Sequence, residues 1–211
     1  VSNPIGAGVL LFPDALALGV TIFWTLGMQN SMNFIDGLDG LSGGISLLAA
    51  VTLGLIALPT SPLLAALCFT LAGALVGFLR HNFHPASIYM GTSGILAVAY
   101  ALAVLAILGT AKVAAALLIL GVPIIDAFFV ILGRLLAGRS PYTPDKSHIH
   151  RRLLDNGFSH RSAVLVLYGI TALLSIGALL LTESATLYAF AGLLVVLGGV
   201  VVYLSRRAEG L

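Results

Sequence analysis

The sequence predicts an all-α bundle of transmembrane helices, and three observations carry that prediction. Hydrophobic residues make up 59% of the chain and charged residues only 9%, whereas soluble domains average about 25% charged residues. The mean hydropathy is +1.10. Apolar runs long enough to cross about 30 Å of hydrocarbon recur along the chain, with no alternating strand pattern between them. We therefore expect one integral-membrane domain over residues 1–211.

About seven apolar runs are long enough to span the membrane. We expect each to be a helix, because a backbone in lipid must satisfy its own hydrogen bonds. In order they are 15–32, 41–58, 63–79, 93–108, 113–135, 163–181 and 187–204. Short turns at 59–62, 109–112 and 182–185 join these spans at one membrane face, and polar loops at 33–44, 80–94 and 134–161 join them at the other. The three polar loops are where we expect a site, since a rigid helical scaffold would hold them.

The basic residues predict the orientation of these spans. If the loop after the first span is cytoplasmic, nine of the ten Lys and Arg residues lie inside and only Lys112 lies outside. The nine are Arg80, Arg134, Arg139, Lys146, Arg151, Arg152, Arg161, Arg206 and Arg207. The polar loops are therefore predicted to face the cytoplasm.

The first polar loop carries two acids at the end of an apolar run, in the sequence NSMNFIDGLDG (residues 30–40). An ionisable group at membrane depth is costly unless it meets water, a cation or a partner. If the helix continues through Asp36 and Asp39, they share one face with Asn30 and Asn33, which suits a divalent cation or a general base. A helix cap formed by Asp39 is the alternative, but it explains only one acid.

The second polar loop ends in NFHPASIYMGTSG (residues 82–94). Asn82 and Tyr89 are candidates for holding a base, and the Gly-rich turn before a helix is a candidate nest for phosphate. The alternative is that its histidines and Tyr89 only anchor the loop at the membrane interface.

The third polar loop contains PDKSHIHRRLL (residues 144–154). His148, His150, Arg151 and Arg152 offer charge-assisted donors for phosphate or diphosphate. A His-x-His pair can also bind zinc, but no third ligand is obvious and the adjacent arginines would repel a cation. An anchor on anionic lipid is the other alternative.

Two buried positions complete the sequence-based interpretation. Asp126 lies within the fifth span, so we expect it to face the bundle interior and either to pair with an arginine or to orient a site residue, with a slight preference for the second. The lone Cys68 lies in an apolar run, which leaves no disulfide and no CxxC metal pair.

Four motifs, at residues 30–40, 82–94, 123–126 (PIID) and 144–154, together resemble the polyprenyl-phosphate N-acetylhexosamine-1-phosphate transferase superfamily. The likeness is closest to its bacterial undecaprenyl-phosphate N-acetylglucosamine-1-phosphate transferase branch. It implies transfer of a sugar 1-phosphate from a UDP-N-acetylhexosamine to undecaprenyl phosphate, with Mg²⁺ or Mn²⁺ and release of UMP. The reaction would occur at the cytoplasmic face of the bacterial plasma membrane, among membrane lipid and without nucleic acid, in cell-wall or surface polysaccharide synthesis. A homodimer is compatible with it.

The resemblance also implies a role for each matching residue. The implied catalytic residues are Asp36, Asp39, His148 and His150. The implied metal ligands are Asn33, Asp36 and Asp39. The implied substrate contacts are Asn30, Asn82, Tyr89, Arg151 and Arg152, with Tyr89 stacking on uracil.

Two departures from the family pattern set the alternatives. Thr92 stands where the family usually has a metal-binding aspartate. The family's N-terminal helices, with their adjacent aspartates, have no counterpart in residues 1–211, so we expect the C-terminal part of a larger transferase. A relative that binds nucleotide-sugar or lipid phosphate without turnover is one alternative; a transporter is another, ranked lower because the acids lie at the cytoplasmic edge rather than at mid-membrane.

Overall fold

The computed structural model describes residues 12–109, 113–136, 138, 140, 148–181 and 183–209, with the side chains of helix residues 183 and 200–209 excepted. All regular secondary structure in these ranges is helical, which confirms the predicted all-α class. The orientation predicted for Lys112, Arg139, Lys146 and the side chains of Arg206 and Arg207 concerns positions outside the described residues.

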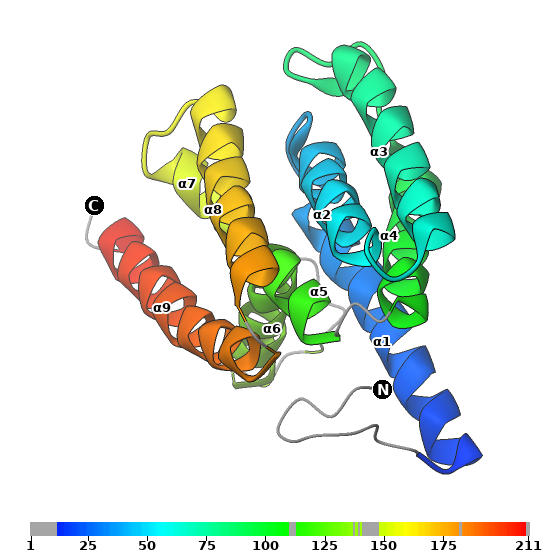
Figure 1. Cartoon of the computed structure of the whole chain (residues 1–211). Helices are drawn as coiled ribbons and strands as arrows, with labels where there is room; N and C mark the ends of the chain where they lie inside the picture. The colour runs from blue at the N-terminus through cyan, green and yellow to red at the C-terminus, as the bar shows by residue number, and fades with distance from the viewer. Residues whose placement is uncertain are drawn as a thin grey trace.

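The described helices follow one another along the chain as Figure 1 shows. The first four are α1 (Asp14–Ile35), α2 (Leu41–Ala57), α3 (Pro62–Asn82) and α4 (Gly91–Leu108). The others are α5 (Val113–Ile119), α6 (Gly121–Leu136), α7 (Ile149–Asp155), α8 (His160–Leu180) and α9 (Glu183–Glu209). Helix α7 was not foreseen, because the whole of 134–161 is expected from the sequence to be a loop.

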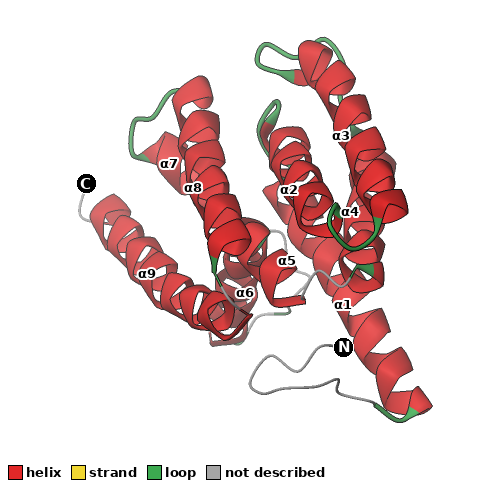
Figure 2. Ribbon diagram, in the orientation of Figure 1, coloured by secondary structure: helices red, strands yellow, loops and turns green. Residues whose placement is uncertain are grey.

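Helix α2 lies at the centre of the bundle and contacts α3, α4 and α8 (Figure 2). Helix α1 packs against α4 on one side and against α6 on the other. Most of the first turns of α2 are buried, and its side chains join those of the neighbouring helices in one hydrophobic core. The α2–α8 and α1–α6 contacts therefore join the first four helices to the later ones.

The segments predicted to span the membrane are all helical where the structure describes them, but they differ in length and continuity. By length and composition, three described helices can cross a membrane, α3, α4 and α8, and α5 with α6 makes a fourth if the bent pair is one span. The other predicted segments are helical too, but α2 has only 17 residues and α1 ends in a polar run. An apolar segment that packs inside a bundle need not be long enough to span it alone.

The fifth predicted span is not a continuous helix. It breaks at Leu120, and α5 and α6 meet at an angle of 77°. Pro123 explains the position of the break, since it has no N–H to donate and its ring clashes with the carbonyl four residues earlier, at Ile119. The proline is tolerated in the first turn of α6 because that turn has no intrahelical partner for its N–H groups.

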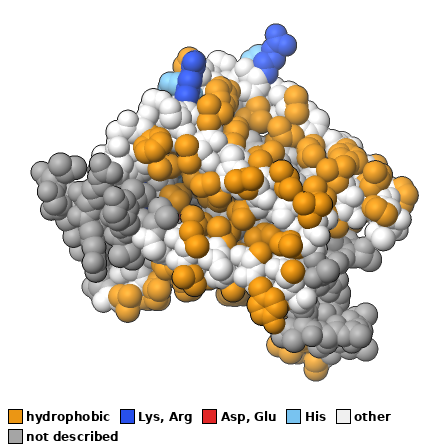
Figure 3. All heavy atoms as spheres, turned by 60° about the vertical axis from the view of Figure 1, so that its left-hand side comes forward, with side chains coloured by type: hydrophobic (Ala, Val, Ile, Leu, Met, Phe, Trp, Pro, Cys, Tyr) orange, Lys and Arg blue, Asp and Glu red, His pale blue; other side chains and the backbone are white. Residues whose placement is uncertain are grey.

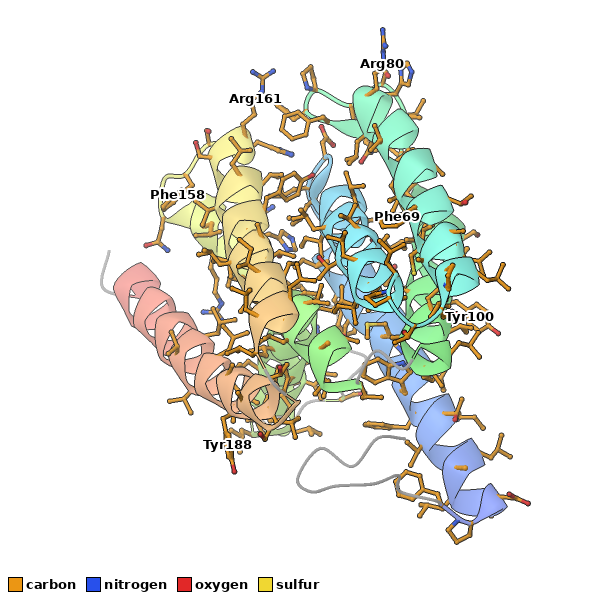
Figure 4. The ribbon with its side chains drawn as sticks, in the orientation of Figure 1. Phe69, Arg80, Tyr100, Phe158, Arg161 and Tyr188 are labelled. Carbon is orange, nitrogen blue, oxygen red and sulfur yellow. The ribbon has the colours of Figure 1, made fainter. Side chains whose placement is uncertain are left out.

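Charged and apolar side chains are separated along the bundle. Figure 3 shows basic side chains at one edge of the molecule, above a broad surface of hydrophobic side chains. Arg80 of α3 and Arg161 of α8 both lie at this end of the bundle, whereas Tyr188 lies at the opposite end (Figure 4). The cytoplasmic location of the basic end stays a prediction.

Candidate active site

The two acids of the first polar loop lie outside any helix. Helix α1 ends at Ile35, before Asp36, so the helical face expected to carry both acids does not form. The alternative, a helix cap formed by Asp39, is not present either, because the N-cap of α2 is Gly40, with a φ of 82° and no side-chain cap. A left-handed φ suits glycine, which has no Cβ. The acids are therefore presented by a tight connection between α1 and α2.

Asp36 and Asp39 have different partners in this connection. Asp36 accepts a hydrogen bond from the Ser42 hydroxyl, and burial raises the pKa of its carboxyl, an effect that the Ser42 hydrogen bond only partly offsets. Asp39 accepts from the backbone N–H of Ala86 at 3.1 Å and lies 3.0 Å from Nδ1 of His84. Desolvation raises the pKa of Asp39, but these hydrogen bonds and the nearby imidazoles outweigh it and leave the pKa lower than usual.

Asn82 joins the first polar loop to the second. Its Oδ1 accepts from the Gly40 N–H at 3.1 Å, and its Nδ2 donates to the carbonyl of Ile88 at 2.9 Å. The side chain is buried. Tyr168 of α8 fixes the same loop by donating its hydroxyl to the Gly40 carbonyl. The structure thus gives Asn82 a role in holding loops, and its nucleotide contact stays a prediction.

Asp126 orients the histidine loop. It is 4% exposed; one carboxylate oxygen lies 2.8 Å from Nδ1 of His148, and the other accepts from the Ile149 N–H at 2.7 Å. Asp126 therefore contacts His148, as the preferred of its two expected roles requires, and the part of this pair in a reaction stays a prediction. Because Nδ1 faces the carboxylate, Nε2 is the nitrogen of His148 that is left to meet a ligand.

His150 brings the histidine loop against the acid loop. Its ring lies directly over Gly37, where a Cβ atom would be 2.1 Å from Nε2. The residue is 7% exposed, and Nδ1 makes no hydrogen bond with any described residue. Burial lowers the pKa of His150 to about 4; the Asp126 carboxylate partly opposes this, and nearby His148 and Arg151 lower the pKa further. His150 is therefore neutral at pH 7.

A groove of about 810 Å³ runs between α1 and α6. Its wall is mostly apolar and is formed by side chains that include Phe23, Leu26, Leu117, Ile124 and Ile131. The polar groups that line it are Asn30, Ser31, Asn33, Arg134 and His148. The groove therefore offers a long apolar surface together with amide, hydroxyl, guanidinium and imidazole donors.

The sequence did not identify Arg134 as a site residue. Its guanidinium carbon lies 5.7 Å from the ring centroid of Phe34, and the side chain is buried. The only signal in the sequence was its position in the last turn of the fifth predicted span. A basic residue there can turn into the bundle and serve a site, or it can point outward and anchor the helix at the membrane interface. Its contact with α1 required the tertiary fold.

Several predicted site residues do not line the groove. Asp36 and Asp39 lie in the loop beyond it, and Thr92 is exposed near the start of α4. Tyr89 is 75% exposed, and Arg151 lies 3.9 Å from Asp155 on the surface of α7. Their roles, and that of Arg152, stay predictions from the resemblance.

Comparison with known proteins extends this picture. The chain matches glycosyl transferase family 4 over residues 1–110. It is 40% identical to the probable undecaprenyl-phosphate N-acetylglucosaminyl 1-phosphate transferase of Bacillus subtilis (strain 168), over 82% of this chain and 50% of the relative. It is 34% identical to the decaprenyl-phosphate N-acetylglucosaminephosphotransferase of Mycobacterium tuberculosis (strain ATCC 25618 / H37Rv), over 97% of this chain and 58% of the relative.

A shorter match reaches a related group of proteins. The chain is 44% identical to the phospho-N-acetylmuramoyl-pentapeptide-transferase of Trichormus variabilis over 44% of this chain and 27% of the relative. The chain spans about half the length of the first two relatives.

Proposed function

This chain belongs to glycosyl transferase family 4, and we propose that its protein transfers N-acetylglucosamine 1-phosphate from UDP-N-acetylglucosamine to a polyprenyl phosphate. The names of the Bacillus and Mycobacterium relatives support the acceptor class and the transferred group. The products are a polyprenyl diphosphate sugar and UMP. We place the reaction at the cytoplasmic face of a bacterial plasma membrane, with undecaprenyl phosphate as acceptor, at the start of cell-wall or surface polysaccharide synthesis.

The groove between α1 and α6 is the observation that carries this proposal. A polyprenyl phosphate has a long apolar chain and a doubly charged head. Its binding site therefore needs an apolar wall and, next to it, donors for the phosphate. The apolar wall suits the prenyl chain, and Arg134 and His148 supply donors for the phosphate. Because the groove lies between helices, the prenyl chain can enter it without leaving the hydrocarbon layer.

The transfer itself makes one bond and breaks one. An oxygen of the lipid phosphate attacks the β-phosphorus of the UDP-sugar; the bond from that phosphorus to the bridging oxygen breaks, and UMP leaves with the oxygen. Positioning and electrostatic stabilisation are the main tasks for the protein in such a step. Arg134 offsets charge on the phosphate, while Asp126 holds His148 through Nδ1 and leaves Nε2 for the substrate.

The donors near Asp36 suit the expected Mg²⁺. Asp36 and the Ser42 hydroxyl bonded to it provide oxygen ligands, and Asn33 at the end of α1 provides an amide oxygen. Hard divalent cations prefer such oxygen ligands. Mg²⁺, when bound, would offset the negative charge of the diphosphate. Asp39 has two imidazoles near it and fits a hard cation less well.

The test is an assay of the full-length protein in detergent with undecaprenyl phosphate and UDP-N-acetylglucosamine. We expect release of UMP and formation of lipid-linked sugar, both abolished by chelation of divalent cations. Absence of UMP with every UDP-N-acetylhexosamine, while the protein remains folded, would refute the proposal.

A groove variant tests the carrying observation directly. Ile131→Trp narrows the groove and should raise the KM for the polyprenyl phosphate with little change in the KM for the UDP-sugar. The matched control is Leu165→Trp, on the exposed surface of α8, and should leave both constants unchanged. The same KM for the polyprenyl phosphate in both variants would contradict the assignment of the groove to the lipid.

Thr92 favours a second candidate function, binding of the nucleotide-sugar or lipid phosphate without turnover. A hydroxyl cannot supply the charge of the aspartate that the family usually has at this position. If turnover is absent in the native protein but appears in Thr92→Asp, the second function is the correct one. Turnover by the native protein would exclude it.

A further inference from the structure

Asp39, His84 and His160 form a second polar cluster, outside the groove. Oδ2 of Asp39 lies 3.0 Å from Nδ1 of His84, and the rings of His84 and His160 stack with centroids 4.1 Å apart. One ligand-type atom from each of the three residues lies within 4.8 Å of the others. The residues come from the α1–α2 connection, the α3–α4 connection and the start of α8.

The donors of this cluster are those of a transition-metal site. Two imidazoles and one carboxylate are a set that Zn²⁺ uses readily, with a fourth position for water, whereas Mg²⁺ prefers oxygen ligands throughout. One possible ligand atom of the cluster also has no partner: the buried Nε2 of His160 makes no hydrogen bond with any described residue. A buried polar nitrogen without a partner is destabilising, and a bound metal ion would satisfy it.

The surroundings hold the Asp39 side chain and the backbone of His84 in place. The Ala86 N–H donates to Oδ2 of Asp39 at 3.1 Å. Arg161 donates to the backbone carbonyl of His84 through Nη2 at 3.1 Å. Such outer contacts orient metal ligands. The guanidinium charge opposes a cation nearby, and the Asp39 carboxylate counters that charge.

We propose that Asp39, His84 and His160 bind a divalent transition-metal ion of the Zn²⁺ class, separate from the groove. Tetrahedral ligands at about 2.0 Å from zinc lie about 3.3 Å apart, so the three atoms must draw closer than their present spacing. The part-exposed side chain of His84 allows this by rotation. The bound ion ties together three segments that are distant in sequence. The inference does not depend on the proposed transferase activity.

Metal titration of the purified full-length protein tests the site. Co²⁺ is added first, and we expect one ion to bind per chain, with the visible absorption spectrum of a four- or five-coordinate site. Zn²⁺ should displace the bound Co²⁺, and excess Mg²⁺ should not. His84→Gln and His160→Gln should each weaken Zn²⁺ binding at least about tenfold. His81→Gln is the matched control, since His81 is exposed in the same region and is not in the cluster.

Two further variants keep the test decisive. His160→Cys should retain the metal and add a thiolate–Co²⁺ absorption band, which a purely structural role for His160 would not produce. His148→Gln should bind Zn²⁺ as the wild type does, because His148 is held elsewhere by Asp126. No bound Co²⁺, displacement by Mg²⁺, or wild-type affinity in both glutamine variants would overturn the proposal.

Discussion

Replacing Gly37 by alanine tests the contact that joins the acid loop to the histidine loop. A Cβ atom at Gly37 would lie 2.1 Å from Nε2, 2.7 Å from Cε1 and 2.9 Å from Cδ2 of His150. Ordinary carbon contacts are about 3.5–4.0 Å, so the methyl group would overlap the ring by more than about 1 Å. Gly37 is not among the glycines with positive φ. The penalty is therefore steric and does not come from backbone strain.

The size of the penalty follows from the burial of His150. The ring is 7% exposed, so it cannot turn away without displacing its neighbours or opening the gap between α7 and the acid loop. Overpacking of this kind costs about 1–3 kcal/mol. We expect Gly37→Ala to lower the free energy of unfolding by that amount and to reduce UMP release, because the displaced ring moves the histidine loop.

Denaturation by SDS titration in mixed micelles measures the free energy of unfolding. Gly77→Ala in α3 is the matched control, because a Cβ there meets nothing within 4 Å; alanine should be neutral or stabilising by up to about 1 kcal/mol at this helical position. The double variant Gly37→Ala with His150→Ala removes the ring that the methyl group strikes. The coupling energy between the two changes should be at least about 1 kcal/mol.

Two results would show this reasoning to be wrong. One is a Gly37→Ala protein as stable as Gly77→Ala. The other is strict additivity in the double-mutant cycle, which would mean that the alanine and the imidazole do not meet.

Three further predictions concern the same loops. Burial lowers the pKa of His150 from 6.5 in the unfolded chain to about 4 in the folded chain. Between these two pH values the unfolded chain binds a proton that the folded chain does not. The contribution of neutral His150 to the free energy of unfolding is therefore complete above pH 6.5 and is lost as the pH falls toward 4. At about 1.4 kcal/mol per pKa unit this is about 3 kcal/mol, measurable as a pH dependence of unfolding that His150→Phe lacks. Asp126→Asn should lower the free energy of unfolding by about 1–3 kcal/mol and reduce kcat with little change in the KM for the UDP-sugar, because His148 loses the carboxylate that orients it; unchanged kcat would exclude this role. Asn82→Ala should speed hydrogen exchange at the Gly40 amide, whose acceptor it removes, and exchange at the wild-type rate would show that the tether is unimportant.

The first polar loop shows how far sequence reasoning reached. The composition and the acid spacing predicted a polar site at the end of the first helix, and the helix does end there. The shared face of Asp36 and Asp39 was wrong because it assumed that the helix continues. The glycines on either side allow a tight connection, and the two carboxylates then find Ser42 and His84 as separate partners.

The fifth span gives a similar lesson. Its apolar composition predicted one membrane-crossing helix, although Pro123 was visible in the sequence. Proline near the middle of an apolar run allows either a kink or a break. The 77° bend is seen only in the tertiary structure, where α5 and α6 both contact α8 and α9 and α6 also packs against α1. That bend shapes the wall of the groove with side chains from both helices.

The sequence alone determined that the chain is helical, apolar and polar at three loops, because hydropathy and residue type act locally and need no partner. It also placed Asp126 in the bundle interior, since a carboxylate in lipid has no cheaper position. Only the tertiary structure decided which side chains meet. The pairing of Asp126 with His148, the ring of His150 over Gly37 and the approach of His160 to Asp39 join residues far apart in the chain. Such contacts depend on helix packing, and local sequence patterns do not encode that packing.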